Sequence, residues 1–249
     1  MSIVCSSCNV ELYREVKFCT RCGKQLHKNN VDKRTSSLNL IIVFYATFLL
    51  FAVVSYLLYN EYPLNLYVEI GIESVFALMV VAFSLFDYKE IVKLYKIPRL
   101  NRKVLAFSIV FPLFSAVVVS LSIGYLNESL FGVSENYYSE YLYLEYPLLW
   151  AILFTAILPP IFEELGFRGF LFNSLQKVVS ERITIIATAF IFALIHFSFI
   201  SFIWIFPFGL ILGYMRSKYN TLWYSIIIHF IHNFVVLMID YYNFNYSLF

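Results

Sequence analysis

LNLIIVFYATFLLFAVVSYLLY, residues 38–59, decides the fold class of this chain, because this stretch contains no charged side chain. A helix that crosses the hydrocarbon core of a bilayer needs about 20 such residues. Further apolar segments follow at 64–86, 104–126, 147–162, 183–200, 202–215 and 222–239. We therefore predict an all-α polytopic membrane protein.

The number of membrane helices depends on two segments. Segment 202–215 is the shortest, and its Pro207 and Gly209 predict a kinked or incompletely crossing helix. The stretch 163–182 is polar and amphipathic, and it adds one more helix if it also embeds. We therefore expect seven to eight transmembrane helices.

The composition supports a membrane protein. Hydrophobic residues make up 61% of the chain and charged residues 14%, with a mean hydropathy of +0.75. Soluble domains contain only about 45–50% apolar residues. The net charge of +2 is small and no separate basic tract interleaved with aromatic residues is present, so we expect membrane lipid and no nucleic acid as a partner.

The positive charges predict the orientation. All 18 Lys and Arg residues lie before residue 38, between 87 and 103, between 168 and 182, or at 216 and 218. With the N-terminus inside, every one of these segments is cytoplasmic, and segment 127–146, which has four glutamates and no Lys or Arg, is outside. We expect a cytoplasmic N-terminus and an external C-terminus. Richness in Phe, Ile and Tyr favours an AT-rich genome and a bacterial cell membrane.

All four cysteines lie near the N-terminus in two Cys-x-x-Cys pairs, Cys5 with Cys8 and Cys19 with Cys22. Two such thiolate pairs complete a closed tetrahedral zinc site with no open position for chemistry. Two disulfides are the alternative, but they require an oxidising compartment, whereas the topology puts this segment in the cytosol. We predict a structural zinc ribbon, and the segment lacks the basic and apolar regions of a signal peptide.

The chain divides into three predicted parts. Residues 1–28 form the zinc ribbon, and the polar stretch NNVDKRTSS, residues 29–37, has the composition of a linker. Residues 38–249 form the membrane domain. We expect the ribbon to regulate the membrane domain or to dock a cytosolic partner.

Ionisable side chains within membrane spans are costly, so each one requires a reason. Glu164 and Arg168 are four residues apart, which is the favourable order for an ion pair on one helix face. Glu163, rotated by about 100° from its neighbour, is then free to point elsewhere. One carboxylate would be held by the arginine while the other acts on water.

Imidazole and amide groups come from two later segments. His196 is the only ionisable group in its apolar run, and His229 and Asn233 share a helix face. We interpret His232 as a helix neighbour that is bonded to a backbone carbonyl or that caps the site. A lone buried histidine is often a packing residue, but three segments that each contribute acid, imidazole or amide groups favour a functional site.

Amide hydrolysis requires a base for water, donors for the oxyanion and an acid for the leaving amine. Glu163 with His196 would activate the water, and His229 with Asn233 would donate hydrogen bonds to the oxyanion. Pro159-Pro160 would loosen the helix and admit water and an extended peptide.

These residues occur as Glu163-Glu164-Leu-Gly-Phe-Arg168, Phe192-Ala-Leu-Ile-His196 and His229-Phe-Ile-His-Asn233. They resemble the EExxxR, FxxxH and HxxxN/D motifs of the CPBP family. This family of intramembrane endopeptidases includes the CAAX prenyl proteases and bacterial bacteriocin-processing or self-immunity proteins. The resemblance covers about residues 147–239. It implies a glutamate-dependent mechanism with Glu163 as the catalytic residue, acting with His196 on water, His229 and Asn233 as the oxyanion site, and Glu164 and Arg168 in support.

Three other interpretations remain open. Glu163, His196 and His229 are a ligand set that a catalytic zinc would accept, although the chain has no HExxH motif. The same fold could act without catalysis, as a membrane scaffold or a bacteriocin self-immunity protein. A proton-coupled transporter predicts inverted repeats, which the sequence does not show.

The predicted spans place two of the candidate site residues at different depths in the membrane. Counting places Glu163 near the inner face, but His196 about 21 Å beyond Arg182 along a helix. A shared site requires one of these segment boundaries to move.

Overall fold

The structure is a computed structural model that describes residues 3–5, 7–12, 19–24, 29–97, 101–132, 136–196 and 199–246. Six helices in these ranges are long and apolar enough to cross a membrane, at residues 34–61, 66–85, 102–126, 147–176, 200–219 and 223–244. Large apolar side chains such as Leu50, Leu78 and Phe114 are exposed on them, as lipid-facing helices require. The all-α membrane fold is therefore confirmed, with six such helices among the described residues.

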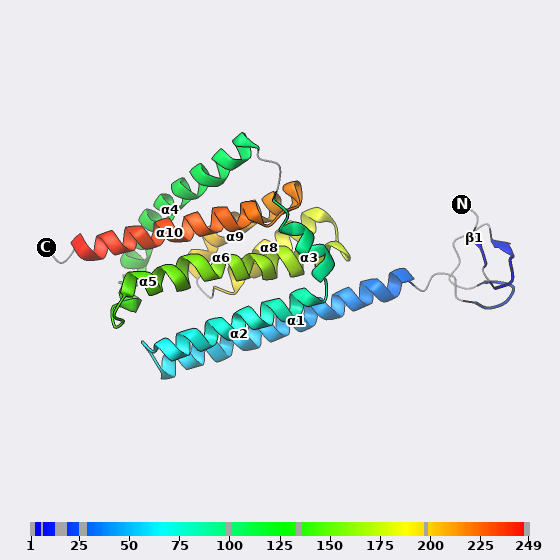
Figure 1. The fold of residues 1–249 in the computed structure, drawn as a ribbon, viewed down its shortest axis with the longest axis horizontal. Coiled ribbons are helices and arrows are strands. Elements are labelled where there is room, and N and C mark those ends of the chain that lie inside the picture. The colour runs from blue at the N-terminus through cyan, green and yellow to red at the C-terminus, as the bar shows by residue number, and fades with distance from the viewer. Residues whose placement is uncertain are drawn as a thin grey trace.

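The first two spans form an antiparallel pair. Helix α1 (Asn29–Glu61) and helix α2 (Leu66–Leu85) lie side by side along their length (Figure 1). The side chain of Asn65 caps α2 by accepting hydrogen bonds from the backbone N–H groups of Tyr67 and Val68. Because α1 begins at Asn29, the predicted linker 29–37 forms the first turns of this helix.

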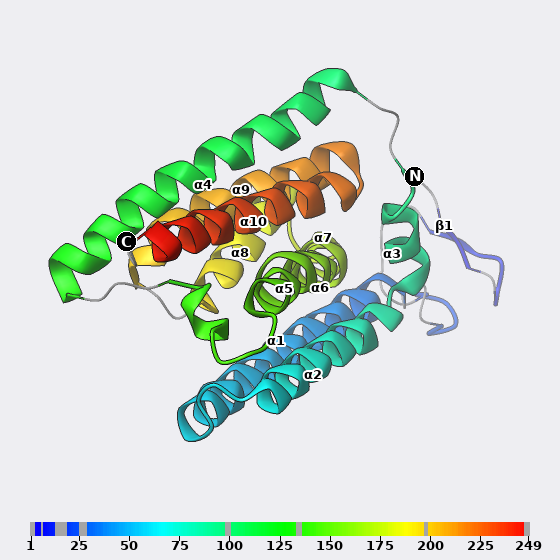
Figure 2. The same ribbon diagram turned by 60° about the vertical axis from the view of Figure 1, so that its left-hand side comes forward.

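One long helix lies between the α1–α2 pair and the group that contains α4 and α10, as Figures 1 and 2 both show. It consists of five consecutive segments: α5 (Pro147–Ala151), η2 (Ile152–Ile157), α6 (Leu158–Glu163), η3 (Glu164–Leu171) and α7 (Phe172–Gln176). Segments η2 and η3 are π-helical, and such wide turns are frequent at functional sites. Pro159 and Pro160 have no backbone N–H to continue α-helical bonding after η2. The polar stretch after residue 162 thus continues the fourth span, which puts Glu163 well inside it.

The remaining helices complete the bundle around this central helix. They are α3 (Tyr88–Leu94), α4 (Arg102–Phe131), the 3₁₀ turn η1 (Ser139–Tyr141), α8 (Glu181–Leu194), α9 (Phe199–Tyr219) and α10 (Trp223–Tyr246). Helix α8 packs on α9, and α4 packs on α10.

Two predicted boundaries in this region were wrong. The expected span 183–200 ends as a helix at Leu194, after 14 residues, and a turn follows at Ile195 and His196. The expected short segment 202–215 lies within α9, which has 21 residues and includes Pro207 without a break. No charged residue, glycine or proline separates the two helices in the sequence, so hydropathy does not mark the turn between them.

A small antiparallel hairpin precedes the membrane helices. Strand β1 (Ile3–Val4) pairs with β2 (Glu11–Leu12), with Ile3 opposite Leu12. The prediction of a ribbon over 1–28 also includes residues 1–2, 6, 13–18 and 25–28, which lie outside the described residues.

Candidate active site

The carboxylate of Glu164 is the centre of a buried polar cluster inside the bundle. One of its oxygens, Oε1, accepts a hydrogen bond from Nη1 of Arg168 at 3.0 Å and lies 3.0 Å from Nδ1 of His229. Glu164 and Arg168 are fully buried, and His229 is 4% exposed. A buried charge is tolerated only when it is paired, so Arg168 and His229 together hold Glu164 in place.

Arg168 connects η3 to two other helices. Its Nη2 donates to the backbone oxygen of Gly209 on α9 at 3.1 Å, and its guanidinium carbon lies 4.3 Å from the ring centroid of Phe192 on α8. A Cβ atom at position 209 would lie 3.2 Å from Ala189 and 3.3 Å from Nη2 of Arg168. Glycine at this position therefore allows α9 to approach both α8 and the arginine.

Glu163 has a different environment from its neighbour. Its Oε2 atom lies 3.8 Å from Nε2 of His229, and this buried oxygen has no hydrogen-bond partner among the described residues. The two ring nitrogens of His229 thus face the two carboxylates, Nδ1 toward Glu164 and Nε2 toward Glu163. Oε2 of Glu163 retains the capacity to accept a proton or a hydrogen bond.

His196 lies at the turn that follows α8. Its Nδ1 is 2.7 Å from the backbone oxygen of Phe192, and because a carbonyl only accepts, Nδ1 carries the proton of this bond. In the neutral ring Nε2 is then a free base. The ring of Phe192 lies 5.0 Å from that of His196 and 5.7 Å from that of His229 between centroids, so the short α8 places His196 close to His229.

Asn233 lies one turn after His229 on α10 and contacts a different element. Its Nδ2 donates to the backbone oxygen of Thr155 in the π-helical segment η2, at 3.0 Å. The structure therefore brings Glu163, Glu164, Arg168 and His229 together, with His196 close to His229, and places Asn233 against the central helix.

His232 contacts a side-chain hydroxyl, and not the backbone carbonyl that we had considered as its partner. Its Nδ1 lies 2.8 Å from Oγ of Ser115 on α4, and its ring packs on that of Phe208 at 4.6 Å between centroids. The residue links α10 to α4 and α9.

Arg216 is a residue of this region that sequence reasoning missed. Its Nε donates to the backbone oxygen of Arg168 at 2.9 Å, and its two terminal nitrogens donate to Asn173 at 2.7 Å and Asn220 at 2.9 Å. Arg168 on the central helix donates to α9, and Arg216 on α9 donates to the central helix, so the two arginines join these helices. In the sequence Arg216 is indistinguishable from the other basic residues that lie between predicted spans.

Glu73 on α2 is a second such residue. In the sequence it follows Glu69 by one helical turn within an apolar span, and nothing there indicates its partner. In the structure it interacts electrostatically with Glu163, and its Oε2 is buried without a partner among the described residues. The signal available in the sequence was an acidic side chain within an apolar membrane span.

The four cysteines of the hairpin gather their sulfur atoms within 4.8 Å of one another and form a group that could hold a metal ion. Cys5 and Cys19 each begin a turn of the same kind. The backbone N–H of Asn9 donates to the backbone oxygen of Cys5, and that of Gly23 donates to the backbone oxygen of Cys19. Asn9 has φ of 52° and Gly23 has φ of 72°, as each turn needs a left-handed residue after its second cysteine.

The chemistry of these four thiols fits a metal. Sulfur separations of 3.6 Å between Cys5 and Cys22 and 3.5 Å between Cys8 and Cys19 are those of unlinked thiols, and all four cysteines are free. The backbone N–H groups of Ser7 and Cys8 lower the pKa of Cys5 to about 6, which favours the thiolate that binds metal. Within the described ranges this is the one such group of three or more His, Cys, Asp or Glu ligand atoms, so the Glu163, His196 and His229 set does not form a comparable cluster.

Comparison with known families gives one match. Residues 145–235 match the family described as type II CAAX prenyl endopeptidase Rce1-like. Neither the comparison with curated proteins nor that with solved structures gives a match. The matched region begins just before the central helix and ends within α10, so it contains all seven residues that define the three motifs. The predicted resemblance is therefore confirmed: residues 145–235 of this integral membrane protein match the Rce1-like family of CAAX-type endopeptidases.

Proposed function

We propose that this chain hydrolyses peptide bonds of a membrane-associated peptide, with Glu163 as the base that activates water. The family match supports a CAAX-type intramembrane protease. The observation that supports Glu163 is the contrast between two adjacent carboxylates. Glu164 is held by Arg168 and His229, whereas Oε2 of Glu163 has no partner among the described residues.

The reaction begins with water between Glu163 and His196. Glu163 takes one proton from the water, which also donates a hydrogen bond to Nε2 of His196. The water oxygen attacks the carbonyl carbon of the substrate, and the carbonyl oxygen becomes an oxyanion. The proton then passes to the amide nitrogen, the carbon–nitrogen bond breaks, and a carboxyl group and an amine leave. Burial strengthens these charge interactions because little water screens them.

We assign the oxyanion to the side of His229 and Asn233. With Glu164 ionised against Arg168, Nδ1 of His229 carries a proton toward Glu164. Nε2 would donate to the oxyanion in the form of the ring that carries a proton on both nitrogens. Asn233 uses one amide N–H on Thr155 and keeps a second one for the substrate.

We further propose that Cys5, Cys8, Cys19 and Cys22 bind a structural zinc ion. A closed set of four thiolates would supply folding energy to the ribbon and leave no position for substrate. Residues 1–28 would act as a regulatory or docking module for a cytosolic partner, with the N-terminus cytoplasmic and the C-terminus outside. The catalytic core would cover about residues 147–239 within a membrane domain of 38–249.

The experiment is a cleavage assay of the purified full-length protein in liposomes with a library of fluorogenic membrane peptides. Wild type is compared with Glu163→Gln and His196→Ala, and with Glu145→Gln as a matched carboxylate control in the exposed segment before α5. We expect cleavage by wild type and by Glu145→Gln only. Equal cleavage by all four proteins would contradict the proposed site, and no cleavage by wild type would favour the scaffold or self-immunity role.

A further inference from the structure

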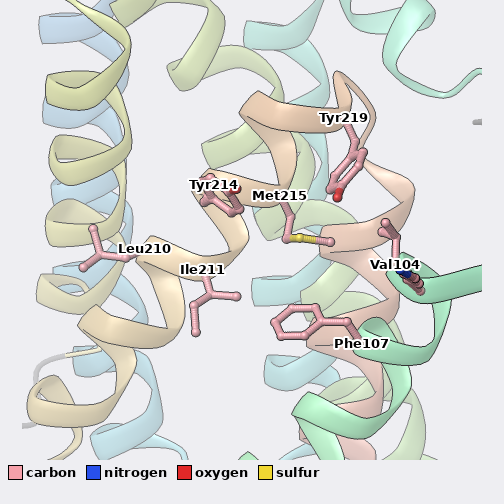
Figure 3. Close-up of a pocket in the computed structure, with 8 residues that line it drawn as sticks. Val104, Phe107, Leu210, Ile211, Tyr214, Met215 and Tyr219 are labelled. Atoms are coloured by element: carbon pink, nitrogen blue, oxygen red, sulfur yellow. The ribbon is translucent and has the colours of Figure 1, made fainter. Parts of the chain in front are cut away.

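A crevice outside the catalytic cluster lies between α4 and α9. Its volume is about 480 Å³, within the range of about 300–1,000 Å³ that is usual for ligand pockets. Figure 3 shows Val104 and Phe107 on one side and Ile211, Tyr214 and Met215 on the other. These side chains give the crevice an apolar lining suited to a hydrocarbon chain.

Positive charge is concentrated at one end of the crevice. Lys103 is part of its lining, in the first turn of α4. Lys218 lies in the last turn of α9, where its Nζ donates to the hydroxyl of Tyr214 at 2.7 Å and lies 5.7 Å from the ring centroid of Tyr219. Both tyrosines line the crevice, and its lining contains no acidic side chain from the described part of the chain. Two ammonium groups therefore lie at one end of the apolar crevice.

The crevice belongs to the membrane-exposed surface. Helices α4 and α9 both contain candidate spans, and Phe107 and Tyr214 are exposed on them. Lys103 and Lys218 are also exposed, so their charges are available at the end of the spans. By the positive-inside pattern, this end faces the cytoplasmic leaflet, where anionic lipids are enriched.

We propose that this crevice binds one anionic phospholipid, with an acyl chain along α4 and α9 and the phosphate between Lys103 and Lys218. The occupant follows from charge complementarity, because an apolar chain with a negative headgroup matches an apolar lining with cations at its mouth. A neutral lipid would fill the same apolar lining without engaging the lysines. The site is separate from Glu163, so the inference does not rest on the proposed catalytic role.

The test is native mass spectrometry of the full-length protein, which measures the lipid that stays bound after release from micelles. The micelles contain phosphatidylglycerol or phosphatidylcholine with the same acyl chains. We expect one phosphatidylglycerol to bind at least about fivefold more tightly than phosphatidylcholine, the factor expected for one lysine near an anionic headgroup. Lys103→Gln with Lys218→Gln should remove this preference. Ile211→Trp should weaken the binding of both lipids by filling the crevice.

The matched control is Lys89→Gln with Lys96→Gln, which removes two exposed lysines near α3 and should leave the preference unchanged. Because the lysine variants change only exposed side chains, they keep the test valid if Ile211→Trp fails to fold. Equal retention of the two lipids by wild type would overturn the proposal, as would an equal loss in both pairs of lysine variants. Displacement of the bound lipid by a neutral membrane peptide without loss of protein stability would also contradict it.

Discussion

Oε1 of Glu164 lies 3.0 Å from Nδ1 of His229 and also accepts the 3.0 Å hydrogen bond from Arg168. Two residues that are 65 positions apart thus meet on one oxygen atom of a fully buried carboxylate. The neighbouring Glu163 faces the other nitrogen of the same ring. This arrangement separates a carboxylate that holds the site from one that is available to react.

We expect Glu164→Ala to destabilise the protein by about 3–5 kcal/mol, because it leaves the buried charge of Arg168 without its partner. Thermal unfolding in detergent micelles measures the change. The double variant Glu164→Leu with Arg168→Met should lose less stability than the two single variants combined, because it removes both charges together. Strict additivity would contradict the coupling between the two residues.

Gly209→Ala should cost about 1–3 kcal/mol and reduce cleavage, since the added Cβ comes within 3.3 Å of both Ala189 and Nη2 of Arg168. Gly71→Ala on α2 is the matched control, because a Cβ there meets nothing within 4 Å. The control should gain up to about 1 kcal/mol from the better helix propensity of alanine. Unfolding temperatures of the two variants provide the comparison, and equal shifts would refute the close approach of α8 and α9.

Arg216→Ala should destabilise the protein by about 2–3 kcal/mol, because the acceptors on Arg168, Asn173 and Asn220, the first two of them buried, lose a charged donor. Arg216→Lys should restore only part of this loss, since an ammonium group cannot reach three acceptors with the geometry of a guanidinium. The exposed Arg102→Ala serves as the control and should have little effect in the same unfolding assay. Full rescue by lysine would show that charge alone is needed.

The ribbon should carry about one zinc ion per chain, and Cys5→Ser with Cys22→Ser should carry none. Elemental analysis of the purified protein measures the metal, and thiol titration after denaturation with a chelator should find four reactive thiols per chain. Two disulfides would give no thiols under the same conditions. The double variant should still cleave peptide in liposomes, because the catalytic groups lie on the membrane helices.

The fold class and the motif residues could be predicted because their signals are local. Charge-free runs define spans, and a spacing of four residues places Glu164 beside Arg168 or His229 beside Asn233. The turn between α8 and α9 could not be predicted, since apolar residues continue through both helices and Pro207 is tolerated inside a membrane helix. The π-helical turns of the central helix have no comparable signature in its residues.

Long-range partners were also beyond a single sequence. Arg216 contacts Arg168 across 48 positions, and Glu73 on α2 interacts with Glu163 from outside the three motifs. The spacing of His229 and Asn233 placed them on one face, but it did not show that Asn233 bonds to Thr155 in η2. These contacts depend on how the helices pack, which hydrophobic periodicity does not specify.

The most direct test of the account is the single-turnover cleavage rate of Glu163→Gln beside wild type, measured in liposomes on a substrate that wild type cuts and in the presence of a chelator. The change removes the base and keeps the shape of the side chain, and Oε2 of Glu163 has no hydrogen-bond partner to lose among the residues that the structure describes. We expect an unchanged unfolding temperature and a rate reduced by at least about 100-fold, with wild type active despite the chelator. A folded Glu163→Gln protein that cleaves at the wild-type rate would contradict the role of Glu163 in activating water.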